Sequence, residues 1–185
     1  MIILTGANGY IGKELTKYFD KQNVEYTAYS RSFSVKQIKN PSKFKITNYN
    51  SIKAGGTLLY LSDNSNFEFY NKLSKNELNN QIKTTKKILN KKFNKIIYFS
   101  TALIDKEFVT ENEKYFNYLN YKKKIEEFVI LKKGVVLRIA NVISQKPKKG
   151  TFVSDFLKFN RNFKNIKIRD DIWRDFIFID DVINL

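Results

Sequence analysis

Short apolar runs alternate along the chain with segments whose apolar residues recur at helical spacing. Buried strands alternating with amphipathic helices are typical of a parallel sheet that helices cover on both faces. The strand-like runs fall at residues 1–5, 24–28, 44–46, 57–61, 96–99 and 135–139. The helical patterns fall at residues 10–22, 75–92 and 113–132. We therefore expect an α/β fold with a Rossmann-type, doubly wound parallel sheet.

The best candidate for a domain boundary is the segment Gln145–Lys149, which contains one of the two prolines, Pro147. Neither internal repeats nor a low-complexity linker interrupt the chain. We expect the Rossmann domain at residues 1–144, and the remnant or the start of a substrate-binding region at 145–185.

Composition restricts the chemistry that this chain can perform. It has 185 residues, of which 42% are hydrophobic, enough to bury the core of one ordinary domain. It contains neither cysteine nor histidine, which excludes disulfides, thiolate catalysis and imidazole bases. We expect no metal site, and proton transfer must use Tyr, Lys, Asp, Glu or a hydroxyl group.

The formal net charge of +16 is compatible with nucleic acid, an anionic membrane surface or acidic small molecules as partners. The lysines are spread along the chain beside abundant Asn, Ile and Tyr, as translation of an AT-rich genome would give, so we assign most of the charge to solvated surface. No helix-turn-helix, zinc or RNA-recognition pattern supports a nucleic-acid binder. Without a long apolar run or a signal peptide, we expect a cytoplasmic protein with no membrane or specific nucleic-acid partner.

A glycine-rich turn joins the first strand to the first helix, and reads Thr-Gly-Ala-Asn-Gly-Tyr-Ile-Gly at residues 5–12. Gly6 permits a tight turn, Gly9 lets the backbone approach a pyrophosphate, and Gly12 lets helix and strand pack closely. Because the turn lies between a strand and a helix, it satisfies the context that a dinucleotide-binding fingerprint needs. Residues 1–144 would then form an NAD(P)-binding domain.

The end of the second strand bears on the choice of cofactor. NAD-selective sites usually place Asp or Glu there to bind the ribose 2′-hydroxyl, whereas this chain has Tyr29-Ser30-Arg31-Ser32. The guanidinium of Arg31 suits a 2′-phosphate, although it is also compatible with a solvated surface arginine. We expect NADP as the cofactor, with NAD as an alternative.

Tyr118 and Lys122 lie four residues apart in a predicted helix, so their side chains share one face. An ammonium close to a phenol stabilises the phenolate, which suits Tyr118 to general acid or base catalysis. Ser100-Thr101 ends the fifth predicted strand, at the sheet edge where open α/β proteins bind ligands. This order of hydroxyl, tyrosine and lysine predicts a catalytic set.

With these motifs in order, the sequence resembles the extended short-chain dehydrogenase/reductases, a family of nucleotide-sugar epimerases, dehydratases and ketoreductases. The segments that match the family's motifs are residues 5–12, Ser100-Thr101, the set Tyr118, Lys122 and Glu126, residues 137–142, and Arg174-Asp175-Phe176-Ile177 through Asp180-Asp181-Val182. The resemblance spans nearly the whole chain. It implies an NAD(P)-dependent nucleotide-sugar oxidoreductase, most simply an NADPH-dependent keto-sugar reductase or an epimerase.

The resemblance also implies roles for individual residues. Thr101 would bond the reacting hydroxyl or carbonyl, Tyr118 would transfer the proton, and Lys122 would hold the nicotinamide ribose. Asn141 and Arg174 would contact the nucleotide-sugar substrate, although Arg174 with Asp175 is equally compatible with a structural ion pair. The cofactor would contact Gly6, Asn8, Gly9, Tyr10, Ile11, Gly12, Arg31, Leu61, Ser62 and Lys122.

Three departures from the family's pattern qualify these expectations. Ser62-Asp63 replaces a small Ala-Ala pair after the fourth strand, which puts cofactor contacts there in doubt. Ala102-Leu103 stands where sugar 4,6-dehydratases carry an Asp-Glu pair, so we do not expect dehydration. Family members also continue past the Asp-Asp-Val segment, so we expect either a fragment or a reduced form whose pocket is open or completed by another subunit, in a homo-oligomer or with a completing partner.

Two other functional classes remain open at this stage. The chain could be a noncatalytic NADP-binding sensor or subunit with a Rossmann fold, or a nucleic-acid binder that exploits its charge. The sequence does not identify the sugar, and it does not separate reductase from epimerase.

Overall fold

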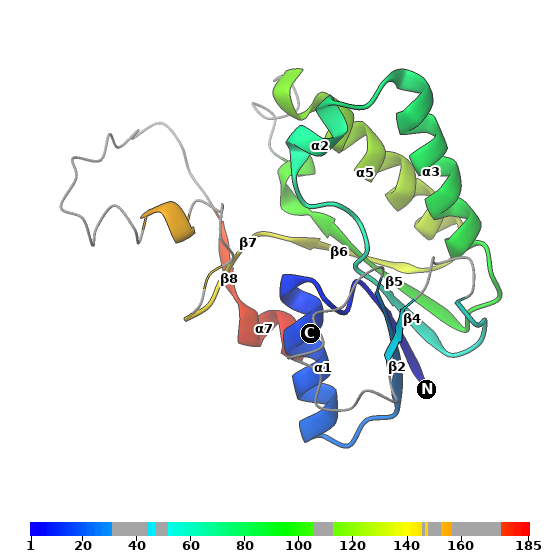
Figure 1. Cartoon of the computed structure of the whole chain (residues 1–185), viewed down its shortest axis with the longest axis vertical. Helices are drawn as coiled ribbons and strands as arrows, with labels where there is room; N and C mark the ends of the chain where they lie inside the picture. Colours follow the sequence, from blue (N-terminus) through cyan, green and yellow to red (C-terminus); the bar gives the residue numbers. More distant parts are fainter. Residues whose placement is uncertain (31–43, 47–51, 106–112, 146, 148–152, 157–174) are drawn as a thin grey trace. The chain divides into compact units, whose positions relative to one another are not determined.

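The computed structural model describes residues 1–30, 44–46, 52–105, 113–145, 147, 153–156 and 175–185 (Figure 1). The chain divides into two compact units, Met1–Arg138 and Ile139–Leu185. The first unit carries the predicted glycine turn and the predicted catalytic set.

A six-stranded sheet forms the centre of the first unit, with the strand order β3-β2-β1-β4-β5-β6. This is the order of a Rossmann fold, which confirms the predicted fold class. The strands are β1 (Ile2–Thr5), β2 (Tyr26–Ser30), β3 (Phe44–Ile46), β4 (Thr57–Tyr60), β5 (Lys95–Thr101) and β6 (Val135–Ile139).

The parallel register brings the carboxyl ends of the central strands to one edge of the sheet. Thr5, at the end of β1, lies beside Tyr29 of β2 and Tyr60 of β4, and Tyr60 in turn lies beside Tyr98 of β5. The strand order reverses between β1 and β4, and open α/β sheets bind their ligands at such a switch point. Met1 precedes β1 at the opposite edge, where it is 56% exposed.

Helices cover both faces of this sheet (Figure 1). On one face lies α1 (Tyr10–Lys21), which buries Gly12, Leu15, Thr16 and Phe19. On the other lie α2 (Phe67–Asn71), α3 (Lys75–Leu89) and α5 (Glu113–Leu131), of which α5 contacts both α2 and α3. The helices predicted at 10–22, 75–92 and 113–132 are thereby confirmed, with ends displaced by up to three residues.

The second strand begins later than predicted, at Tyr26 rather than at Val24. Asn23 adopts a left-handed conformation after α1, and the N–H of Val24 donates to the carbonyl of Phe19. Val24 therefore closes the C-terminal end of the helix, and its backbone is engaged there before the strand starts.

The second unit contains two short parallel strands, β7 (Asn141–Ile143) and β8 (Phe176–Phe178), followed by α7 (Ile179–Asn184). Ile179 and Val182 of α7 are buried. Across the described ranges of both units, none of the helices combines the length and the apolar character that a bilayer span requires.

Candidate active site

The glycine turn after β1 depends on the absence of side chains at two positions. Gly6 has a φ of +71°, and a Cβ there would collide with the carbonyl of Leu61. A Cβ on Gly12 would collide with the carbonyl of Gly6. These contacts show that the turn, and its packing against the first turn of α1, need glycine at both positions.

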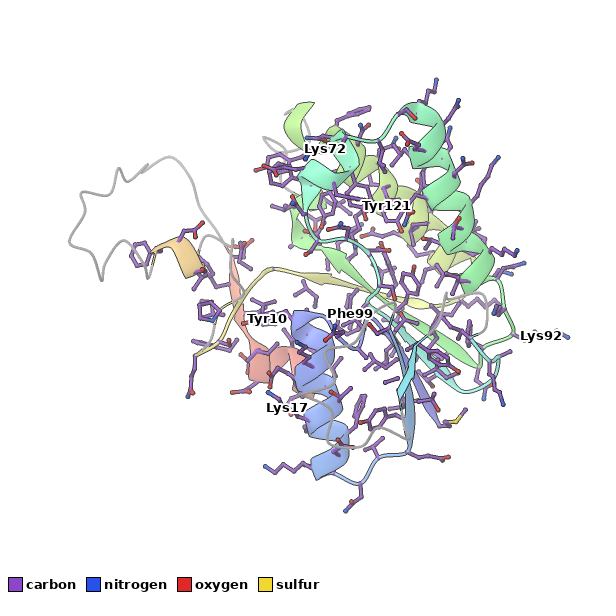
Figure 2. All side chains as sticks on the ribbon, in the orientation of Figure 1. Tyr10, Lys17, Lys72, Lys92, Phe99 and Tyr121 are labelled. Carbon is purple, nitrogen blue, oxygen red and sulfur yellow. The ribbon has the colours of Figure 1, made fainter. Side chains whose placement is uncertain are left out.

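The N-terminal end of α1 is open to an anion. Gly9 is the exposed N-cap residue, has no side chain to cap the helix, and donates its N–H to the carbonyl of Gly6 over 2.8 Å. The first turn of α1, which begins at Tyr10 (Figure 2), contains no acidic residue. Because the first N–H groups of a helix have no intrahelical acceptor and carry partial positive charge, this end fits a phosphate group. Asn8 and Ile11, also expected to contact the cofactor, flank it and are half-buried.

The ends of β1 and β4 are tied together beside this turn. The buried hydroxyl of Thr5 accepts a hydrogen bond from the N–H of Leu61 over 3.2 Å. Ser62 follows, and its Oγ atom is buried and has no hydrogen-bond partner among the described residues. A buried hydroxyl without a partner is uncommon, and a bound polar group would satisfy it.

The next residue, Asp63, forms an ion pair with the predicted catalytic lysine. Lys122 Nζ lies 2.9 Å from Asp63 Oδ2, and both side chains are 5% exposed. Lys122 also donates to the carbonyl of Phe99 over 3.2 Å. Burial, the largest single influence, acts to lower the pKa of Lys122. The attraction of Asp63 together with the weaker effects of Tyr118 and Glu126 outweighs it, so the pKa lies above its ordinary value.

Two tyrosine hydroxyls complete the contacts of Asp63. Tyr98 OH donates to Oδ2 over 2.5 Å, and Tyr121 OH donates to Oδ1 over 2.6 Å. Tyr121, labelled in Figure 2, belongs to α5 and also bonds Thr85 of α3 over 2.8 Å. Burial, followed by the negative charge of Asp63, raises the pKa values of both tyrosines, so both remain neutral donors.

The structure brings Tyr118 close to Lys122, as predicted from their spacing. The ammonium lies 5.9 Å from the centre of the Tyr118 ring, and that ring packs against Tyr70 at 5.4 Å. Thr101 ends β5, and its hydroxyl accepts from the N–H of Leu103 in the short helix η4 (Ala102–Asp105), which contacts α5. The neighbouring Ser100 Oγ is buried, and the part of the chain that the structure describes offers it no hydrogen-bond partner.

Glu126, the last member of the motif that begins at Tyr118, has a structural partner. It pairs with Arg138 of β6 over 2.7 Å, and the same guanidinium reaches Asp105 of η4 over 2.6 Å. These two ion pairs join α5, β6 and η4, the last of which follows Thr101 directly. Glu126 therefore stabilises the elements around the candidate site.

The remaining predicted residues lie elsewhere. Arg31 and Arg174 fall outside the described residues, so their expected contacts with cofactor and substrate remain predictions. Asn141 belongs to the second unit, where its backbone N–H and its side-chain amide both donate to the carbonyl of Asp175, each over 3.1 Å. Throughout the described part of the chain, no cluster of three Asp or Glu side chains could hold a metal ion.

Sequence reasoning did not identify Asp63, Tyr98 and Tyr121 as members of this site. The one available signal was a carboxylate directly after a buried strand, where the resembling family has a small residue. Its partner lies 59 residues further along the chain. Local spacing cannot reveal such a pairing.

Comparison with solved structures extends the fold assignment. The chain is similar to TunA, an NAD-dependent NDP-hexosamine 5,6-dehydratase involved in tunicamycin biosynthesis, with a TM-score of 0.73 and 16% identity over 99% of this chain and 69% of that one. It is similar to MoeE5 in complex with UDP-glucuronic acid and NAD, with a TM-score of 0.67 and 14% identity over 99% and 69%. It is also similar to the UDP-glucose 4-epimerase of Thermotoga maritima with UDP-glucose, with a TM-score of 0.66 and 18% identity over 99% and 71%.

The fold thus matches that of NAD-dependent nucleotide-sugar epimerases and dehydratases, and the chain spans about 70% of the length of these structures. No protein-family model and no curated protein sequence matches this chain.

Proposed function

We propose that this chain is an NAD(P)-dependent oxidoreductase of nucleotide sugars that belongs to the extended short-chain dehydrogenase/reductases. Within that class we favour an NADPH-dependent keto-sugar reductase, with an epimerase as the nearest variant. The observation that carries the proposal is the proximity of Tyr118 and Lys122, on a Rossmann sheet whose first helix begins at an uncapped glycine turn.

The glycine turn and the first turn of α1 would hold the pyrophosphate of the cofactor, with Gly9 as the point of closest approach. Leu61 and Ser62 would contact the cofactor beyond it, where the orphaned Ser62 hydroxyl offers a hydrogen bond. Arg31 would bind the 2′-phosphate of NADP. When bound, the nicotinamide supplies or accepts the hydride, and the protein positions the reactants.

Each member of the catalytic set has a defined task in this proposal. Thr101 would bond the reacting oxygen of the sugar, and Tyr118 would move a proton to or from that oxygen. Lys122 would donate from its ammonium to the nicotinamide ribose. Asn141 and Arg174 would contact the nucleotide sugar. Activity could also require a second copy of the chain or a completing subunit.

A noncatalytic NADP-binding module is the second candidate, and one observation favours it. The ammonium of Lys122 is already held by Asp63 and by the carbonyl of Phe99, both inside the protein. If it cannot also serve a ribose and Tyr118, the glycine turn would still bind the cofactor, although more weakly, and turnover would be lost.

A ligand panel separates the two candidates. Thermal unfolding should be measured with NAD, NADP, their reduced forms, and UDP-sugars, because a ligand that binds the native state raises its apparent stability. We expect stabilisation by NADP(H) and by UDP-sugars. Loss of reduced-nicotinamide absorbance with a keto-sugar nucleotide would support the enzyme, cofactor binding without turnover would support the module, and the absence of any nicotinamide effect would contradict both.

A further inference from the structure

The carboxylate of Asp63 is enclosed by hydrogen-bond donors from two elements. Tyr98 of β5 and Lys122 of α5 bond Oδ2, and Tyr121 of α5 bonds Oδ1. Every partner donates, which matches the acceptor capacity of an ionised carboxylate. Asp63 itself follows β4 at the carboxyl edge of the sheet, the same edge at which the glycine turn follows β1.

The ammonium of Lys122 is equally enclosed. It has two acceptors, Asp63 Oδ2 at 2.9 Å and the carbonyl of Phe99 at 3.2 Å. It also lies 4.9 Å from the centre of the Tyr98 ring and 5.9 Å from that of Tyr118. An isolated charge at such depth would be strongly disfavoured, so the carboxylate is what allows the ammonium to exist there.

We propose that Asp63 is a positioning residue of the active site, which fixes the Lys122 ammonium beside Tyr118 and keeps it charged for binding the cofactor ribose. This inference rests on the proposed function, and it adds a residue at a position where the resembling family carries a small side chain. Asp63 acts through Lys122 and does not itself touch the reacting atoms.

Among the groups that face Lys122, Asp63 contributes most to keeping the ammonium charged, and Tyr118 adds a weaker contribution. Glu126 is the other carboxylate that favours the charged lysine, but Arg138 neutralises it. Tyr70 of α2 and the two tyrosines that bond Asp63 have raised pKa values, chiefly through burial, and carry no charge at neutral pH. Without Asp63, burial would lower the pKa of Lys122, and the amine would lose its proton as the pH rises through that lowered value.

The test compares the pH dependence of NADPH affinity in two variants. Asp63→Asn keeps the shape and one acceptor but removes the charge, whereas Tyr121→Phe removes a hydrogen bond to the same carboxylate and keeps the charge. We expect the NADPH affinity of Asp63→Asn to fall roughly 10-fold between about pH 6 and pH 9, because the loss of the carboxylate would let burial lower the Lys122 pKa far enough to reach that interval. Parent and Tyr121→Phe should show no such fall.

Unfolding measurements keep the proposal testable if Asp63→Asn does not fold. The double variant Asp63→Asn/Lys122→Met removes both charges, and replacing a buried pair in this way is often tolerated. We expect Lys122→Met to restore folding in the Asp63→Asn background. An Asp63→Asn protein with the pH profile of the parent, or a double variant no more stable than Asp63→Asn, would overturn the role of Asp63. A parent that binds no nicotinamide cofactor would instead contradict the proposed function.

Discussion

The guanidinium of Arg138 holds the carboxylate of Glu126 through two nitrogens, Nη2 at 2.7 Å and Nε at 3.2 Å from Oε2. Glu126 is buried on α5, whereas the Arg138 side chain is 41% exposed at β6. A second carboxylate, that of Asp105, bonds the same guanidinium from a side chain that is 57% exposed. The two ion pairs of Arg138 therefore differ mainly in burial.

Because Glu126 is buried and Asp105 is exposed, we expect the loss of each ion pair to lower the free energy of unfolding by a different amount. Arg138→Met breaks both pairs, and its main cost is that the Glu126 carboxylate is left buried without a cation. We expect the free energy of unfolding to fall by about 2 kcal/mol, less than for a fully buried pair because water reaches Arg138. Asp105→Asn breaks an exposed pair and should cost less than about 1 kcal/mol. Chemical denaturation of both variants measures the two values, and equal costs would contradict the argument from burial.

Tyr118→Phe tests proton transfer in the proposed reaction. The ring and its packing on Tyr70 remain, but the transferable proton is lost. We expect NADPH affinity to survive while turnover of a keto-sugar nucleotide falls by roughly 10²–10⁴-fold. Tyr115→Phe, on the same helix, is the matched control and should keep the parent rate. Single-turnover kinetics measure this rate. A Tyr118→Phe protein as active as the parent would refute the assignment of proton transfer to Tyr118.

Arg31→Ala tests the proposed preference for NADP. If the guanidinium binds the 2′-phosphate, its removal should weaken NADP binding by about 10-fold or more and leave NAD binding nearly unchanged. Lys17→Ala removes one positive charge from the exposed face of α1 and controls for net charge. Calorimetric titration with both cofactors gives the comparison. Equal losses for NAD and NADP would show that Arg31 does not bind the 2′-phosphate.

Two glycines of the same turn should respond differently to alanine. Gly12→Ala places a Cβ against the carbonyl of Gly6, in a buried contact, and should destabilise the protein by roughly 1–3 kcal/mol. Gly9 is exposed, and a Cβ there would lie 3.0 Å from the carbonyl of Gly6, a tight contact but less severe than the one at Gly12. Gly9→Ala should therefore lower the unfolding midpoint less than Gly12→Ala does. If Gly9 approaches the pyrophosphate, its alanine variant should instead lose cofactor affinity. Thermal unfolding and titration together separate the two effects.

The succession of strands and helices along the chain could be predicted because most of these elements have their own local pattern of apolar residues. Some elements can be recognised from adjacent residues alone. Examples are the apolar run at 57–61 and the glycine turn at 5–12, which both lie where they were expected. Helix α2 was missed since it is only five residues long, too short to display a helical period. Strands β7 and β8 were missed for a similar reason, as each has three residues.

The candidate site was predicted only in part, since its charge balance depends on contacts between distant segments. The four-residue spacing of Tyr118 and Lys122 was enough to place them together. The ion pair of Lys122 with Asp63 was not foreseeable, because it joins a loop after β4 to a helix 59 residues later. Asp63 stood out in the sequence as an unexpected carboxylate, but its effect on the ammonium required the fold.

The central position of β1 has a practical consequence for how the protein can be attached to a surface. Met1 is exposed at the amino edge of the sheet, and the chain then crosses the full strand before it reaches the glycine turn at the carboxyl edge. An N-terminal tether would therefore leave the first unit from the edge opposite the turn. Immobilisation through Met1 should keep the end of α1 accessible, so that cofactor binding can be followed on a sensor chip.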